Sequence, residues 1–160
     1  MTTPDPDTLA RARAASVLQL AMRLGRLADE EAVRRVAAAG GPAAGLRTAH
    51  TRLFPHVALE GTRPSEIARR LGVSKQAVGP LIDELCAMGV FERVPDPDDR
   101  RAVRVRWSDR GRQAMLHGLG VLGGLERELA EALGDGGMAA LRELLVRALE
   151  RADAWGDGGG

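Results

Sequence analysis

"SEIARRLGVSKQAVGPLIDELCAMG", residues 65–89, predicts two short helices joined by a tight turn. Pro64, directly before it, suits the first position of a helix, where a missing backbone N–H is no loss. Gly72 can adopt the left-handed conformation that ends this helix, and Ser74 is a favourable N-cap for the next one. Gly89 ends the second helix in the same way. Two short helices around a glycine-containing turn predict a helix-turn-helix.

The segment that follows, residues 92–107, reads ERVPDPDDRRAVRVRW and predicts a two-stranded hairpin. Its proline and aspartate residues favour a turn. After the turn, apolar and polar residues alternate, which is typical of a strand with one buried face. We expect Val103, Val105 and Trp107 to face the core. Arg104 should face outward, and a hairpin placed directly after a helix-turn-helix is a wing.

Further helices are expected on both sides of this lobe. Over residues 8–39, apolar residues recur at three- and four-residue steps, which predicts one long helix. A second helix is expected over residues 43–56, and two more follow Ser108, separated by the glycine-rich break at 134–137. These helices carry more apolar surface than one small lobe can cover, so their natural partner is a second copy of the chain. The sequence predicts a mainly α protein with a small β-wing, in which N- and C-terminal helices form a dimerisation region.

The composition bounds the class of protein. The chain has 160 residues, of which 44% are hydrophobic and only 2% aromatic, so Ala, Leu and Val must fill the core. A single cysteine, Cys86, excludes an internal disulfide framework and fits a reducing compartment. No apolar run approaches the roughly 20 residues that a membrane helix needs, and the first residues do not resemble a signal peptide. We expect a cytoplasmic protein.

The helix-turn-helix segment, the wing DPDDRRAVRVRWSDRG and the flanking helices resemble the MarR family of bacterial transcriptional regulators. The wing followed by Ser-Asp-Arg-Gly is the most specific part, and residues 46–115 match the family pattern well. The resemblance implies a homodimeric winged helix-turn-helix repressor that binds a pseudo-palindromic operator in double-stranded DNA. Many members of the family also bind a small phenolic or aromatic ligand.

The resemblance also implies a division of the chain. Residues 1–42 would form the N-terminal dimerisation helix and a linker, and residues 43–112 the winged helix-turn-helix DNA-binding lobe. Residues 113–155 would form the C-terminal dimerisation helices. Residues 156–160, GDGGG, are expected to be a disordered tail.

The second helix of the pair, residues 74–88, corresponds to the recognition helix of the family. The N-terminal residues of such a helix reach base edges in the major groove. By that resemblance, Lys75 and Gln76 are candidates for base contacts, since Gln can bind adenine and Lys can bind guanine or a phosphate. Ser74 and Gly79 would lie near the DNA backbone.

The wing has its own candidates for DNA contact. By resemblance to the family's Asp-x-Arg wing tip, Asp99 would orient Arg101, and Arg101 would enter the narrow, negative minor groove. A carboxylate can pair with a guanidinium and fix its direction without neutralising the whole wing. Arg100 and Arg104 are better placed for phosphates.

Four positions need a separate interpretation. Pro80 lies within the recognition helix, where its ring clashes with the carbonyl of Gln76, so a kink is expected. Arg63 stands where Ser or Thr would usually cap the preceding helix, and we assign it to a phosphate contact instead. We interpret Asp96 and Asp98 as residues that simply form the turn of the hairpin.

The sequence has no spacing typical of a metal or catalytic site. His50, His56 and His117 lack ligand spacing, and there is no Cys-x-x-Cys, nucleophile elbow or phosphate loop. We therefore expect no metal, no cofactor and no enzymatic activity, and a half-buried structural role for Cys86. The alternative to a DNA-binding regulator is a winged-helix module that binds protein, with the arginines as a solvated face. A small helical enzyme is a distant third hypothesis.

Overall fold

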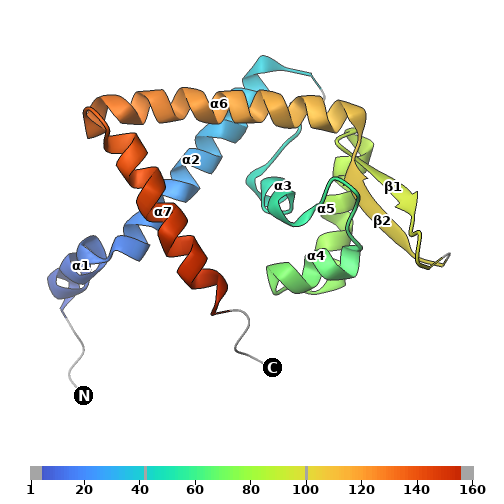
Figure 1. The fold of residues 1–160 in the computed structure, drawn as a ribbon, viewed down its shortest axis with the longest axis horizontal. Helices are drawn as coiled ribbons and strands as arrows, with labels where there is room; N and C mark the ends of the chain where they lie inside the picture. The colour runs from blue at the N-terminus through green and yellow to red at the C-terminus, as the bar shows by residue number, and fades with distance from the viewer. Residues whose placement is uncertain (1–4, 42, 100, 156–160) are drawn as a thin grey trace. The chain divides into compact units, whose positions relative to one another are not determined.

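The computed structural model describes residues 5–41, 43–99 and 101–155 (Figure 1). Its helices are α1 (Pro6–Ala15), α2 (Val17–Ala39), α3 (Thr48–Thr51), the 3-10 helix η1 (Phe54–His56), α4 (Pro64–Leu71), α5 (Lys75–Ala87), α6 (Asp109–Leu133) and α7 (Gly137–Asp153). Its strands are β1 (Phe91–Pro95) and β2 (Val103–Trp107). The chain forms two compact units, residues 1–121 and 122–160, and α6 runs from the first into the second. The fold is mainly α with a small β-wing, as the sequence predicts.

The helix-turn-helix forms where the local signals place it. Pro64 occupies the first turn of α4, and Gly72 ends that helix in the left-handed conformation at φ 66°. The Ser74 hydroxyl accepts the N–H of Ala77 (3.2 Å) and caps α5. Gly89, at φ 71°, turns the chain out of α5 and into β1. The predicted helix-turn-helix is confirmed.

The wing is a two-stranded antiparallel sheet that follows α5 directly. Phe91 lies opposite Trp107 at the base of the hairpin. Thr62, two residues before α4, adds one bridge to the same sheet. Its N–H donates to the carbonyl of Val105 (2.8 Å), and the N–H of Val105 donates back (2.9 Å). These two bonds hold the wing against the start of α4.

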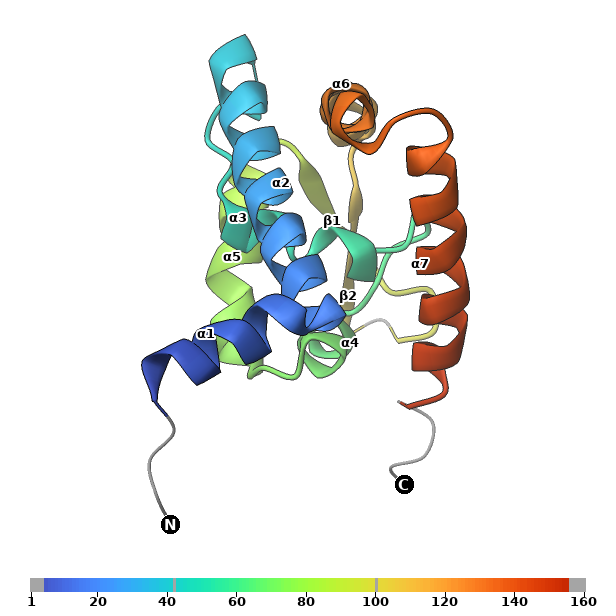
Figure 2. The same cartoon turned by 90° about the vertical axis from the view of Figure 1, so that its left-hand side faces the viewer.

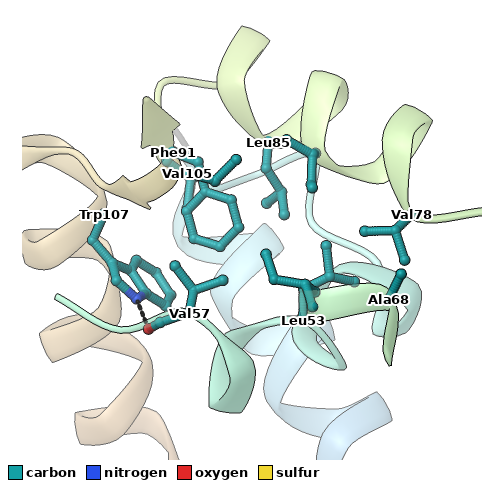
Figure 3. Close-up of a cluster of buried hydrophobic side chains, with 11 residues drawn as sticks. Leu53, Val57, Ala68, Val78, Leu85, Phe91, Val105 and Trp107 are labelled. Carbon is teal, nitrogen blue, oxygen red and sulfur yellow. Dashed lines mark hydrogen bonds between the residues drawn. The ribbon is translucent and has the colours of Figure 1, made fainter. Parts of the chain in front are cut away.

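Figure 3 shows the buried core of the first unit, which η1, α4, α5 and the two strands line. The Trp107 indole N–H donates to the carbonyl of Val57 (3.1 Å), so this buried polar group is satisfied. Phe54 and Phe91 lie with their ring centroids 4.8 and 4.9 Å from that of Trp107. Three of the four aromatic side chains in the sequence therefore meet in this core. Its buried residues are Leu53, Val57, Ile67, Ala68, Val78, Ile82, Leu85, Val90, Phe91, Val105 and Trp107.

Two expected helices outside the helix-turn-helix are wrong. The single helix expected over residues 8–39 is two helices, because Ser16 is extended (φ −82°, ψ 113°) and its hydroxyl accepts the N–H of Gln19. The helix expected over residues 43–56 is reduced to α3 and η1. Pro55 has no N–H to continue an α-helix, and it lies inside the short 3-10 helix instead.

The expectation that Val103 faces the core is also wrong. Val105 and Trp107 are buried as predicted, but Val103 is 43% exposed. Val103 lies at the turn end of β2, where the wing extends away from the helices of the lobe (Figure 1). The predicted alternation of buried and exposed side chains therefore holds for Val105 and Trp107, but the buried core does not extend to Val103 at the turn end of the strand.

The outer helices bury few apolar side chains within the chain. α1 and α7 contain no buried residue among those described, and α2 contains one, Val36. The exposed apolar side chains of α2, α6 and α7 are Val17, Leu18, Leu20, Met22, Leu24, Leu27, Leu116, Leu119, Leu122, Leu133, Leu144, Leu145, Val146 and Leu149. None of the helices in the described part of the chain is long and apolar enough to cross a membrane.

Candidate nucleic-acid interface

The candidate base contacts lie at the exposed N-terminus of α5. Val78, Ile82 and Leu85 are buried in the core and fix the rotation of the helix about its axis. Lys75 and Gln76 therefore point into solvent, and both are exposed. The local geometry leaves both side chains free to reach a ligand without unfolding the lobe.

Ser74, Gly79 and Pro80 shape the same end of the helix. The Ser74 hydroxyl accepts a helix N–H, and it still has its own proton to donate to an outside acceptor such as a phosphate. Gly79 is partly buried and has open space where a side chain would stand. α5 stays helical across Pro80, which has no N–H to donate to the carbonyl of Gln76.

Asp99 shapes the wing tip by holding its backbone. Its Oδ1 accepts the N–H of Arg101 (3.0 Å), and its carbonyl accepts the N–H of Ala102 (2.9 Å). The carboxylate therefore orients Arg101 through the backbone, whereas the resemblance to the family implies a pair with its guanidinium. Arg101 is exposed. Arg100, the other wing-tip candidate, lies outside the described residues.

Asp96 is an ion-pairing centre at the turn end of the wing, directly after β1. Its side chain is fully buried, and its Oδ2 accepts hydrogen bonds from the Nε of Arg63 (2.6 Å) and the Nε of Arg104 (3.0 Å). Its Oδ1 accepts the backbone N–H of Asp98 (2.9 Å), and the Nη2 of Arg104 donates to the carboxylate of Asp98 (2.7 Å). The guanidinium groups of Arg63 and Arg104 hold the pKa of Asp96 well below its usual range.

The interpretation of Asp96 as a turn residue alone is therefore wrong. Asp96 does accept a turn hydrogen bond, but it also joins β2 to the start of α4 through two arginines. One signal in the sequence points to this role: Arg63 stands at the N-cap of α4, where its side chain makes no capping bond and needs another partner. The Nε groups of Arg63 and Arg104 both donate to Asp96, so the direction of each guanidinium is fixed within the chain.

Arg101 differs from the other described arginines of the wing. Arg93 pairs with Asp83 of α5 (2.6 Å), Arg106 with Glu92 (2.7 Å), and Arg104 with two aspartates. Among the described residues, no carboxylate pairs with the guanidinium of Arg101. The acids of the wing therefore pair with the arginines of its two strands, and among the described residues they leave the guanidinium of Arg101, in the turn, without a carboxylate partner.

Replacing Asp96 with asparagine is expected to remove a pH-dependent part of the stability. The pKa of Asp96 is lower in the folded chain than in the unfolded chain, where it is about 3.9. Its stabilising contribution is therefore complete above that unfolded value and is lost as the pH falls through the lower folded one. In urea unfolding, Asp96→Asn should be less stable than the wild type at neutral pH, and the difference should shrink below about pH 4.

The matched control for this variant is Asp98→Asn, because Asp98 binds the same Arg104 but its side chain is 75% exposed. Its effect should be smaller, since exposed ion pairs contribute little. A difference between Asp96→Asn and the wild type that stays constant down to about pH 2 would contradict the charged pairing.

Cys86 and the histidines show no sign of a reactive site. Cys86 is half-buried on α5, and burial raises the pKa of its thiol, which disfavours the reactive thiolate. This supports the predicted structural role. Within the part of the chain that the structure describes, no three His, Cys, Asp or Glu side chains gather where they could hold a metal ion.

Comparison with known proteins finds a match to the segment that contains the helix-turn-helix and most of the wing. A family model described as "MarR family" matches residues 44–102. The apo form of wild-type MarR from E. coli is similar to this chain with a TM-score of 0.66 and 21% identity, over 84% of this chain and 96% of that one. RV1404 from Mycobacterium tuberculosis gives 0.62 and 22%, over 100% and 98%. CouR from Rhodococcus jostii RHA1, bound to p-coumaroyl-CoA, gives 0.59 and 21%, over 83% and 91%. No curated protein sequence matches the chain.

Proposed function

We propose, because residues 44–102 match a MarR family model and the fold is similar to that of MarR from E. coli, that the protein is a member of this family and a homodimeric transcriptional repressor that binds a pseudo-palindromic operator in double-stranded DNA. The observation that carries the proposal is the exposed guanidinium of Arg101 at the wing tip, on the same lobe as the polar start of α5. No catalytic role is assigned to any residue.

The recognition helix supplies the sequence-specific contacts in this proposal. With α5 in the major groove, Lys75 and Gln76 face base edges, where Gln binds adenine and Lys binds guanine or a phosphate. The Ser74 hydroxyl and the backbone near Gly79 lie against the phosphates of one strand. These assignments rest on the exposure of the side chains and on their position at the start of the helix.

The wing supplies the minor-groove and backbone contacts. Arg101 enters the minor groove, whose narrow and negative form attracts an arginine. Arg63 and Arg104 contact phosphates, with their direction set by Asp96, and Arg100 is assigned to a phosphate through the resemblance to the family. A guanidinium that is already fixed loses less side-chain entropy when it binds.

Dimerisation is supported by the exposed apolar side chains of α2, α6 and α7. Exposed apolar patches rimmed by polar residues are typical of protein interfaces, and most soluble oligomers are symmetric homodimers or built from them. We assign residues 1–42 and 113–155 to this interface and residues 43–112 to DNA binding. Two recognition helices must then match half-sites about 34 Å apart.

We further propose that a small aromatic or phenolic ligand releases the protein from DNA. The support is the likeness to CouR, whose structure contains p-coumaroyl-CoA. Such a ligand would act by preferring a spacing of the two recognition helices that does not fit the operator, to the extent of its differential affinity for the two states. A regulator of this kind acts in the cytoplasm, and we place the protein there.

Binding of a mixed-sequence DNA duplex by the full chain is expected to weaken steeply as salt is raised. Each phosphate contact releases counterions, and the logarithm of the affinity falls by about 0.9 per contact for each tenfold rise in salt. Fluorescence anisotropy across a salt series measures this slope. Arg63→Ala should make the slope shallower by about 0.9 for each protomer, because one phosphate contact is lost.

The control is Arg127→Ala, which removes an exposed arginine of α6 outside the DNA-binding lobe. Because Arg127 lies within the segment assigned to dimerisation, light scattering first checks that the variant is as dimeric as the wild type, and its slope should then be unchanged. If the wild type binds no duplex even at low salt, the proposal that the protein binds DNA is contradicted. The winged-helix module that binds protein would then be the better function.

A further inference from the structure

Helix α3 lies between α2, which the proposed function assigns to dimerisation, and α5, which it assigns to DNA binding. It contains only Thr48–Thr51, and it contacts both α2 and the recognition helix α5 (Figure 2). Two adjacent residues, His50 and Thr51, make hydrogen bonds to opposite neighbours, His50 to α5 and Thr51 to α2. The free-energy cost of breaking the bond to α5 differs from that of breaking the bond to α2.

The bond from α3 to α5 is firm. His50 is 1% exposed, and its Nδ1 lies 3.1 Å from the backbone nitrogen of Arg47, which can only donate. Nδ1 is therefore the acceptor, so Nε2 carries the ring proton and donates to the carboxylate of Glu84 on α5 (2.9 Å). The Arg47 guanidinium donates to the same carboxylate. Separating α3 from α5 would break two hydrogen bonds to the same carboxylate at once and would expose the buried ring of His50.

The bond from α3 to α2 is loose. The Thr51 hydroxyl oxygen lies 3.0 Å from Oδ2 of Asp29 on α2 and 2.9 Å from the carbonyl oxygen of Thr48 in its own helix. A hydroxyl has one proton, so it can donate to only one of these acceptors at a time. When α2 moves away, the hydroxyl can turn to Thr48 and remain satisfied. Asp29 is only partly buried and can then bind water.

We propose that the joint between the N-terminal helical arm and the DNA-binding lobe lies at Asp29 and Thr51, and that α3 moves together with the recognition helix. His50 and Glu84 are then positioning residues of α5. The joint has two states: in one the Thr51 hydroxyl donates to Asp29 of α2, and in the other it donates to the carbonyl of Thr48. Hinges in proteins are short segments whose backbone angles change when two rigid bodies alter their relative orientation. The name recognition helix rests on the proposed function, but the joint itself is a property of the fold.

Distances between spin labels within one protomer test the joint without DNA. In a Cys86→Ser background, which removes the only native thiol, one label pair stands at Arg23→Cys on α2 and Gln76→Cys on α5. A second pair stands at Arg52→Cys, directly after α3, and Gln76→Cys. Electron–electron double resonance is measured on labelled protein mixed with an excess of unlabelled protein, so that only intra-protomer distances contribute.

Thr51→Val removes the hydroxyl at nearly constant shape, and it should broaden the α2–α5 distance distribution while the α3–α5 distribution keeps its width. Thr51→Ser restores the hydroxyl and should return both distributions to those of the wild type. Glu84→Ala, a change at a half-exposed side chain, should broaden the α3–α5 distribution because it removes the acceptor of both His50 and Arg47.

Three results would overturn the proposal: an unchanged α2–α5 distribution in Thr51→Val, equal broadening in Thr51→Val and Thr51→Ser, or an unchanged α3–α5 distribution in Glu84→Ala. None of these measurements involves DNA. A chain that binds no duplex but shows the predicted distances would therefore refute the proposed function and leave the joint in place.

Discussion

Arg101→Ala is expected to weaken binding to a selected operator duplex by about 10- to 100-fold. Arg101 is exposed at the wing tip, and no described carboxylate pairs with its guanidinium, whereas the other described wing arginines are engaged by acids. Its backbone is already held by Asp99, so little order has to be gained when the side chain enters the minor groove. Fluorescence anisotropy with wild-type and variant protein at one salt concentration gives the ratio of affinities.

The thermal midpoint and the dimer content of Arg101→Ala should equal those of the wild type, because the side chain is exposed and lies outside the core. Arg127→Ala on α6 lies outside the DNA-binding lobe and, once its dimer content is shown to equal that of the wild type, should bind the operator like the wild type. If Arg101→Ala binds normally, the wing tip does not contact DNA. If it loses the dimer or the fold, Arg101 has a structural role that the contacts do not show.

Gly111→Ala is expected to destabilise the protein by about 3 kcal/mol, at the upper end of the usual cost of overpacking. A Cβ at this position would stand 1.8 Å from the carbonyl oxygen of Val90, and the obstacle is backbone that cannot move aside as a side chain could. For a chain of this length the thermal midpoint should fall by about 6–12 °C. Calorimetry or circular dichroism measures the shift.

The close approach at Gly111 has a structural cause. Ser108, just before α6, donates its backbone N–H to the carbonyl of Val90 (3.1 Å), and its hydroxyl donates to the carbonyl of Gly89 (2.5 Å). The same hydroxyl oxygen accepts the N–H of Gly111 (2.8 Å). These bonds draw the first turn of α6 onto the backbone between α5 and β1. Only glycine fits there.

Gly118→Ala is the matched control on the same helix. Apart from the adjacent residues and the backbone of α6 itself, nothing lies within 4 Å of a Cβ added at Gly118, so this change should be neutral or should raise the stability by up to about 1 kcal/mol through helix propensity. Equal stability of Gly111→Ala and the wild type would show that α6 does not start against Val90. The Ser-Asp-Arg-Gly segment would then lack the structural role given to it.

The helix-turn-helix and the wing were predictable from the sequence because their signals are local. Pro64, Gly72 and Ser74 each determine the backbone within one turn of themselves, and the alternation before Trp107 needs only a few residues of strand. The same local rules also placed the start of a helix after Ser108, whose hydroxyl oxygen accepts the N–H of Gly111. Local signals were therefore sufficient wherever a single residue sets the conformation of its neighbours.

The contacts that orient the candidate site could not be predicted in this way. The pair of Arg63 with Asp96 joins residues 33 positions apart, and the pair of His50 with Glu84 joins residues 34 apart. Such pairs depend on how the elements pack, and the residues on either side of Asp96 fit a simple turn equally well. The break at Ser16 was missed for a related reason, since the apolar spacing continues across it and only the cap interrupts the helix.

The most direct test of the central claim is selection of duplexes bound by the full chain from a pool of random sequence. Two recognition helices related by two-fold symmetry should enrich an inverted repeat whose half-sites are centred about 34 Å apart, one helical turn of DNA. Enrichment of no sequence at all, or of a single motif without a second, inverted copy, would contradict a symmetric dimer that reads DNA through α5 and the wing.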